Sequence, residues 1–417
     1  MNMDNIINIL WAMIASFATY SCMYAFRKPL TAATFDDYLL FGINYKVLII
    51  ITQVIGYLSA KFIGIKVISE LKHKNRALSI LILIAISNIA LLLFAITPFP
   101  YNFLWIFFNG LPLGFIWGIV FSYIEGRKVT DILATFLSIS FIVSSGFVKS
   151  MGRYFIESWK ITEFWMPFVV GTIFLPLIIL CVWMLEKIPK PTEEDIVSRS
   201  PRISLNAEKR KSLFISYAPG LIAILMANML LTVCRDIKDN FLVEIFKSIG
   251  LSTNISIYTQ TETIVGITVL LLLSMLVFVQ KNKKAFFIIH LIMLLGISLM
   301  FISALFIQYK IADTFTLVIL HGIGLYSAYI VFQSLYFERF IATFKIAGNV
   351  GFLIYLSDFV GYLASCFILI LKEFSGFSTN WAQFFILLSY IVSAFGIIAV
   401  LLAMFYFNKK SSVSTHL

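Results

Sequence analysis

Two arginines lie in stretches of this sequence that otherwise carry almost no charge. Arg27 follows more than twenty uncharged residues, and Arg235 ends a similar apolar stretch 208 residues further along the 417-residue chain. A guanidinium group is planar and donates two parallel hydrogen bonds to a phosphate or a carboxylate. Burying an arginine in a membrane helix costs about 2.5–3.5 kcal/mol. The pair therefore predicts an oxyanion site, and the alternative is that each arginine only snorkels to lipid headgroups.

Further polar residues share a helical face with these cations. Tyr24 and Tyr20 precede Arg27 by three and seven residues, and Tyr57 precedes Lys61 by four residues. Both spacings place side chains on one side of a helix. We expect the two tyrosines to line the path of the anion and Lys61 to add positive charge. The alternative for Lys61 is a structural pair with a nearby carboxylate.

Acidic residues and one more lysine are candidates for coupling or gating. Asp239 follows Arg235 by four residues, so the spacing predicts an intrahelical pair that neutralises the arginine while the site is empty. Lys28 lies about 100° around the helix from Arg27 and is not expected to take part. Ionisable residues within apolar spans usually face a cavity or one another. Three more such residues are candidates, with structural ion pairs as the alternative: Glu262, Lys149 and Asp358.

The elements that must position these residues are membrane-spanning helices. Hydrophobic residues make up 60% of the chain and charged residues 13%, well beyond the composition of soluble domains. A bilayer core takes about 20 apolar residues per helix. We predict an all-α membrane protein with twelve spans, over residues 6–31, 45–69, 76–97, 101–124, 130–155, 163–185, 213–235, 255–280, 285–308, 311–336, 343–371 and 380–407.

The basic residues predict the orientation of these spans. If both termini are cytoplasmic, 20 of the 32 Lys and Arg residues fall on the cytoplasmic side and only six in the opposite loops. This asymmetry follows the positive-inside rule. It accounts for the net charge of +11 without a nucleic-acid partner. We therefore expect a multi-pass protein of the inner (cytoplasmic) membrane with both termini in the cytoplasm.

A charged segment divides the spans into two sets of six. Residues 186–212 hold 12 charged residues and three prolines, a composition typical of a linker. We predict one six-helix bundle over residues 1–185, a second over 213–408, and a cytoplasmic tail over 409–417. Pseudo-twofold symmetry between two such bundles would bring Arg27 and Arg235 to facing positions at their interface.

This sequence resembles the major facilitator superfamily and, within it, the organophosphate:phosphate antiporters. The family's first helix carries tyrosines three and seven residues before an Arg-Lys pair, as Tyr24 and Tyr20 stand here before Arg27. GYLSAKFIG resembles the family's second helix around Lys61, FNGLPLGFIWG its fourth, and YTQTETIVG its eighth around Glu262. Arg235 is similar to the arginine of the seventh helix. The resemblance implies the two-bundle major facilitator fold and an anion site on these residues.

The chain also departs from that family. The family's fifth helix carries a histidine, whereas FLSISFIVSSGFVKSMGRYF has none and offers Lys149. The Asp-Arg signature after the second helix is absent from GIKVISELKHKNR. Asp236 and Asp239 make the surroundings of Arg235 more acidic than expected. These differences bear on the substrate, and the chain could belong to a sister group.

The sequence therefore favours a monomeric secondary transporter with alternating access for a small anionic solute. An organic phosphate exchanged for inorganic phosphate is the substrate pair that the resemblance implies. The alternatives are a proton-coupled carboxylate transporter, with Glu262 or Asp358 as the proton site, and a ligand sensor with a transporter fold. No nucleophile and base or metal-ligand spacing points to an enzyme, so we expect neither cofactor nor metal.

Overall fold

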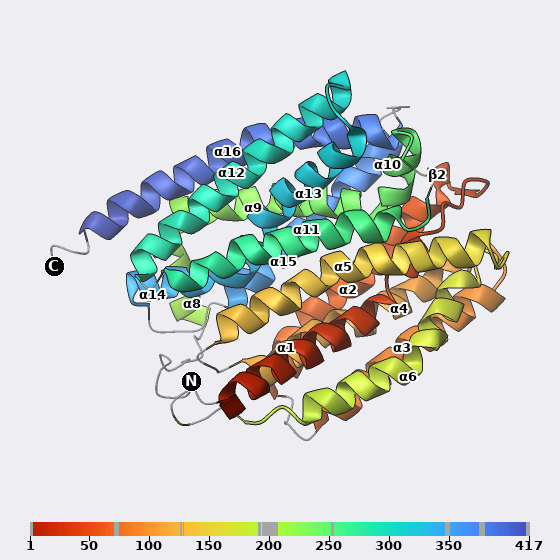
Figure 1. The fold of residues 1–417 in the computed structure, drawn as a ribbon, viewed down its shortest axis with the longest axis horizontal. Helices are drawn as coiled ribbons and strands as arrows, with labels where there is room; N and C mark the ends of the chain where they lie inside the picture. The colour runs from red at the N-terminus through yellow and green to blue at the C-terminus, as the bar shows by residue number, and fades with distance from the viewer. Residues whose placement is uncertain are drawn as a thin grey trace.

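The structure is a computed structural model that describes residues 3–70, 75–125, 127, 129–190, 193, 207–251, 254–279, 281–346, 351–374 and 380–413. It is almost entirely helical (Figure 1). Twelve of the described helical segments are long and apolar enough to cross a membrane. The predicted fold class is confirmed, and the chain is a multi-pass membrane protein.

The N-terminal half contains six spanning helices and a small hairpin. A 3-10 turn, η1 (Pro29–Thr31), follows the first helix, and strands β1 (Leu39–Leu40) and β2 (Ile43–Asn44) pair in antiparallel fashion before the second. The helices are α1 (Met3–Tyr24), α2 (Tyr45–Glu70), α3 (Arg76–Ile96), α4 (Phe103–Ile124), α5 (Thr130–Glu157) and α6 (Met166–Glu186).

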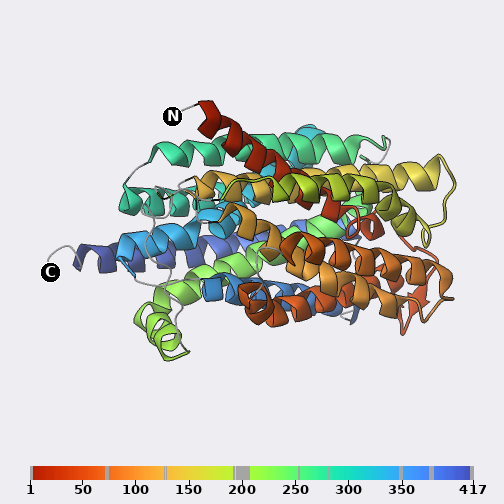
Figure 2. The same ribbon diagram turned by 90° about the horizontal axis from the view of Figure 1, so that it is seen from below.

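The C-terminal half repeats this plan with more interruptions. Its elements are α8 (Ala207–Ser216), α9 (Ala218–Asn240), α10 (Leu242–Ser248), α11 (Ile257–Ser274), η3 (Met275–Phe278), α12 (Asn282–Tyr309), α13 (Thr314–Val331), η4 (Phe332–Tyr336), α14 (Phe337–Phe344), α15 (Gly351–Phe374) and α16 (Trp381–Val413). The two halves lie side by side, with α5 of the first against α11 of the second (Figures 1 and 2).

The two ends of the bundle are distinguished by what they carry. We call the end that holds β1 and β2 the hairpin face. Both chain termini and α8 lie toward the opposite end, which we call the linker face (Figure 1). The spanning helices run between the two faces, so position along a helix tells how far a residue lies from each.

The first helix is shorter than predicted. It ends at Tyr24 instead of continuing to residue 31, and the chain passes through turns into η1 at Pro29. A proline cannot donate to the carbonyl four residues before it, here that of Ala25, and its ring clashes with that carbonyl, which explains the early end. Arg27 and Lys28 therefore lie in a turn, where helical spacing does not set their directions.

The tenth and eleventh spans also differ from the prediction. The tenth is continuous from Thr314 to Phe344 through the π-helical segment η4, so the predicted start of the eleventh at residue 343 is wrong. The eleventh helix is α15, which begins at Gly351, and residues 347–350 lie outside the described residues. A π-helical turn widens a helix locally and is frequent at functional sites.

Part of the predicted linker is helical. Within residues 186–212, α8 begins at Ala207 and leads directly into α9. Residues 191–192 and 194–206 lie outside the described residues. At the other end of this half, α16 continues to Val413, beyond the predicted boundary at 408.

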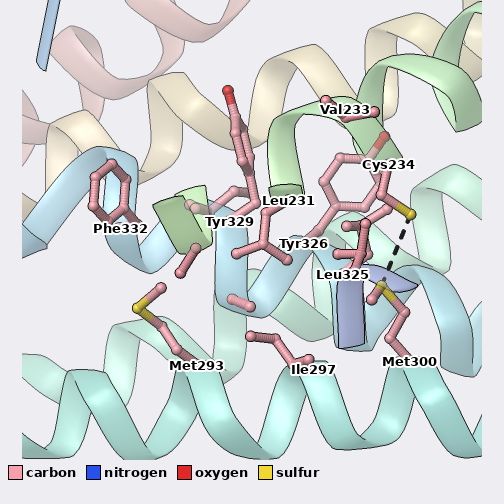
Figure 3. Close-up of a cluster of buried hydrophobic side chains, with 14 of the residues drawn as sticks. Leu231, Val233, Cys234, Met293, Ile297, Met300, Leu325, Tyr326, Tyr329 and Phe332 are labelled. Atoms are coloured by element: carbon pink, nitrogen blue, oxygen red, sulfur yellow. Dashed lines mark hydrogen bonds between the residues drawn. The ribbon is translucent and has the colours of Figure 1, made fainter. Parts of the chain in front are cut away.

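Close packing of apolar helices sets the positions of the polar residues. In the C-terminal half, α9, α12 and α13 share a buried core in which the rings of Tyr326 and Tyr329 extend away from Met293 and Ile297 on α12 (Figure 3). In the N-terminal half, α2 and α4 approach so closely that a Cβ at Gly110 would overlap the carbonyl oxygen of Gln53. Tight contact of this kind depends on small residues.

Candidate functional site

A cavity between the two halves gathers most of the predicted site residues. About 480 Å³ of it, a volume that includes space open to solvent, is not filled by atoms. The lining comes from α1, the turn after it, α2, α4 and α5 on one side and from α9, α13, η4 and α15 on the other. The lining residues are Tyr20, Tyr24, Arg27, Tyr57, Lys61, Trp117, Ser138, Phe141, Arg235, Tyr329, Gln333, Ile354, Asp358 and Tyr362.

Arg27 is buried at the end of the cavity nearer the hairpin face. Its guanidinium carbon lies 4.1 Å from the centre of the Tyr57 ring, a cation–π contact. Its Nε has no hydrogen-bond partner, and no described carboxylate lies within ion-pair distance of the group. A buried guanidinium without a counter-ion is costly, so a bound anion would stabilise it.

Arg235 reaches the cavity from α9 in the other half. Its guanidinium carbon lies 4.8 Å from the ring centre of Tyr329 and 5.6 Å from that of Tyr362. Its Nη2 lies 2.8 Å from Oδ1 of Asp236, and its Nε is buried without a hydrogen-bond partner. The predicted pairing of Arg235 with Asp239 is wrong, because the guanidinium folds back onto the adjacent carboxylate.

Lys61 and Asp358 face each other across the cavity toward the linker face. Lys61 Nζ lies 3.4 Å from Asp358 Oδ2, and Gln333 Nε2 donates to Asp358 Oδ1 at 3.1 Å. Gln333 belongs to the π-helical η4, so the local widening of the helix directs it here. The alternative expected for Lys61, a pair with a nearby carboxylate, is therefore present. Lys61 also lines the cavity.

The tyrosines hold the cations from several sides. Tyr20 and Tyr24 lie edge to face, with ring centres 5.5 Å apart. Tyr57 contacts the cations on both sides of it, with Lys61 Nζ 5.4 Å from its ring centre. Aromatic rings stabilise a cation without cancelling its charge. The cavity therefore stays electropositive near Arg27.

Asp239 lies outside this cavity, one layer closer to the hairpin face, and binds two lysines of the other half. Lys28 Nζ lies 2.6 Å from Asp239 Oδ2, and Lys149 Nζ lies 2.7 Å from Oδ1. Ser145 donates to the same Oδ1, and Lys28 also donates to Asn240 Oδ1 at 2.7 Å. The expectation that Lys28 points away from the functional residues is therefore wrong. Its direction follows from the turn after α1.

A further ion pair joins the halves at the hairpin face. Lys46 Nζ lies 2.5 Å from Glu244 Oε1 and donates to the backbone oxygen of Thr31 at 2.9 Å. Burial raises the pKa of the Glu244 carboxyl, although Lys46 opposes this shift. Glu262 pairs with Lys238 within the C-terminal half. Lys46 and Glu244 could not be identified from the sequence, because both lie beside loops whose approach depends on the packing of the halves.

Helix α5 packs tightly against α11 at the same level. A Cβ at Gly146 would overlap the backbone oxygen of Tyr258 and lie 2.7 Å from Cβ of Glu262. Near it, Ser150 Oγ accepts hydrogen bonds from the amide and the hydroxyl of Thr259, at 3.1 and 2.8 Å. The two halves are thus closed against each other at the hairpin face.

The structure brings together six of the nine predicted site residues around one cavity: Tyr20, Tyr24, Arg27, Lys61, Arg235 and Asp358. The other three, Lys149, Asp239 and Glu262, lie in the ion pairs between the cavity and the hairpin face. Sequence reasoning missed Gln333, Trp117, Tyr329 and Tyr362 as lining residues. Aromatic and amide residues within apolar spans are too frequent here to be singled out by type.

Comparison with known proteins supports the fold. The family described as "Family of unknown function (DUF5690)" matches residues 29–410. No curated protein matches the sequence.

Several solved structures of transporters have the same fold. The nucleoside transporter NupG is 16% identical over 98% of this chain and 99% of its own, with a TM-score of 0.62. A D-xylose-proton symporter is 15% identical over 95% and 97%, with a TM-score of 0.60. The peptide transporter POT, in complex with alafosfalin, is 12% identical over 94% of both chains, with a TM-score of 0.62. The chain therefore has the major facilitator fold.

Proposed function

We propose that this chain, which belongs to the family of unknown function DUF5690, is a secondary transporter that binds a small anionic solute between its two halves. The observation that carries the proposal is the pair of buried guanidinium groups in one cavity. Each has an Nε without a hydrogen-bond partner, and Arg27 has no described carboxylate near it. An anion bound between them would use donors from both halves at once.

A tetrahedral oxyanion suits this arrangement. Each guanidinium group can offer two parallel N–H donors, and a phosphate has enough oxygens to accept from both. An organic phosphate exchanged for inorganic phosphate is therefore our first candidate. Tyr20 and Tyr24 would contact the organic part of the solute, and Lys61 would approach it from the linker face when it leaves Asp358.

Alternating access would follow from the ion pairs at the two ends of the cavity. The closed hairpin face has pairs between the halves at Lys149 with Asp239 and at Lys46 with Glu244. Toward the linker face, Lys61 and Asp358 form a longer pair. We propose that these sets open in alternation, with the hairpin face outside the cell and the linker face in the cytoplasm of a cell whose inner membrane holds the protein.

Two contacts argue against the alternative of a proton-coupled carboxylate transporter. It needs Glu262 or Asp358 as an available proton site, and the structure pairs these residues with Lys238 and Lys61. A sensor that binds the same anion without transport would use the same cavity. Flux therefore separates the sensor from the transporter.

Counterflow in proteoliposomes tests this function. Vesicles loaded with inorganic phosphate should take up labelled phosphate, and external glycerol phosphate or sugar phosphates should compete. Competition by dicarboxylates alone would favour the carboxylate transporter. Specific binding of phosphate without uptake would favour the sensor.

A further inference from the structure

Two buried lysines of the N-terminal half share one carboxylate of the other half. Lys28 and Lys149 contact different oxygens of Asp239, at 2.6 and 2.7 Å. Lys149 Nζ also donates to Ser145, and Lys28 Nζ donates to Asn240. All three charged side chains are at least nine-tenths buried. One carboxylate balances one ammonium group, so this layer holds one positive charge too many.

Positive charges also outnumber carboxylates when the neighbouring cavity is included. Asp358 has Lys61 as its cation, Asp236 has Arg235, and Asp239 has Lys149. Arg27 and Lys28 remain, adjacent in sequence and without a carboxylate of their own. Two uncompensated charges in a buried region are strongly unfavourable. An arginine stays protonated, whereas a lysine can lose its proton.

We propose that Lys28 is a proton-binding site and that a proton on Lys28 and an anion beside Arg27 bind together, so that each anion crosses the membrane with a proton. This inference rests on the proposed function, since it concerns the anion of the same cavity. The step is an acid–base equilibrium in which the neutral amine of Lys28 takes up a proton to become ammonium. The anion supplies the negative charge that the ammonium needs.

The direction of the linkage follows from the surroundings of Lys28. It faces Asp239 and Asn240 on α9 and Lys149 on α5, beside its neighbour Arg27. The Lys46–Glu244 pair of α2 and α10 lies further toward the hairpin face. Burial lowers the pKa of Lys28 to about 7, while Asp239 opposes this shift.

An open hairpin face would hydrate Lys28 and restore a pKa of about 10.4. The open state then binds more protons than the closed, empty state. Closure is therefore favoured as the pH rises from about 7 to about 10.4. An anion beside Arg27 would raise the pKa of Lys28 in the closed state, and closure would then retain the proton.

A distance measurement without ligand tests the lysine itself. Spin labels on cysteines replacing Ser158 and Tyr309, both exposed near the hairpin face, report the separation of the two halves, and all four native cysteines are buried. The wild type should move from open to closed populations between pH 6.5 and 9.5. Lys28→Met should be closed at every pH and Lys28→Arg open at every pH. The control Lys247→Met, at an exposed pair with Asp36, should keep the wild-type profile.

Calorimetry with inorganic phosphate tests the linkage to the anion. Titrations at pH 8 in buffers of different ionisation enthalpy give the number of protons taken up on binding. The wild type should take up more protons than Lys28→Met, by at most about one, because part of the unliganded wild type already carries a proton on Lys28 at pH 8 and the phosphate's own protonation is common to both.

The two experiments separate the two proposals. Equal proton uptake by wild type and Lys28→Met would overturn the proton linkage and leave the anion site intact. Absence of phosphate binding would overturn the phosphate-transport proposal, and the distance measurement would still decide the role of Lys28. If the open and closed populations of the wild type did not change with pH, the assignment of Lys28 as the proton site would be overturned.

Discussion

At the scale of single residues, the distribution of counter-ions separates the cations of the interior. Lys61, Lys149 and Arg235 each have a carboxylate, whereas Arg27 is held by the Tyr57 ring. Cation–π contacts position a charge without neutralising it. Arg27 is therefore the residue with most to gain from a bound anion, and Asp358 limits how positive the other end of the cavity is.

Asp358→Asn should make anion binding tighter and exchange slower. The change removes a negative charge from the cavity and frees Lys61, so phosphate should bind about three- to tenfold more tightly, or about 0.7–1.4 kcal/mol. Release should slow because the lysine no longer returns to its carboxylate. Binding and counterflow on the same preparation measure both effects. Asp37→Asn, in the exposed loop near the hairpin, is the matched control, and weaker binding in Asp358→Asn would refute this role.

Sequence reasoning at this scale worked for residues whose type is rare in an apolar span. Arg27, Arg235, Lys61 and Asp358 stand out because each is charged, and all four line one cavity. It failed for Lys28, whose direction was taken from an ideal helix although Pro29, which cannot donate to the carbonyl of Ala25, ends α1 early. It also failed for Asp239, because the spacing of residues along one helix does not show that lysines of the other half lie beside it.

At the scale of the elements, the contact between α5 and α11 determines whether the hairpin face can close. Gly146 of α5 lies against the backbone of Tyr258 and the side chain of Glu262. The span lengths of these helices could be predicted from apolar runs. Their pairing could not, since it depends on which small residues meet across the interface.

Gly146→Ala should keep the hairpin face open. Its Cβ would overlap backbone of the other half, and overpacking costs about 1–3 kcal/mol, so the ratio of closed to open protein should fall about 5- to 150-fold. Labels at positions 158 and 309 measure that ratio. Gly152→Ala is the control, because a Cβ there would also be crowded, 2.7 Å from Cβ of Ala32, but only by residues of its own half. A closed population unchanged by Gly146→Ala would show that this contact does not govern closure.

At the scale of the whole molecule, the asymmetry of loop charge predicts how the fold sits in the membrane. The described residues contain twelve candidate spans, and both termini lie toward the linker face (Figure 1). Twelve spans place both ends of a chain on one side. Hydropathy alone was enough to predict the number of spans, because every backbone group in lipid must be paired within its helix.

Reporter tags test the orientation. A tag after Leu417 and a tag inserted within residues 195–205 should both report the cytoplasm. A tag between Asp36 and Tyr38, on the hairpin face, should report the opposite side. A periplasmic signal from either of the first two would contradict the orientation.

The central claim is that Arg27 and Arg235 bind one anion between the halves, and equilibrium binding of inorganic phosphate to the purified protein tests it most directly. Lysine keeps the charge but loses the planar pair of donors. Arg27→Lys and Arg235→Lys should each bind at least about thirtyfold more weakly, since breaking a buried charged hydrogen bond costs about 2 kcal/mol or more. Arg153→Lys, at the exposed pair with Glu157, should bind as the wild type does. Wild-type affinity in both variants, with unchanged thermal unfolding, would contradict the account.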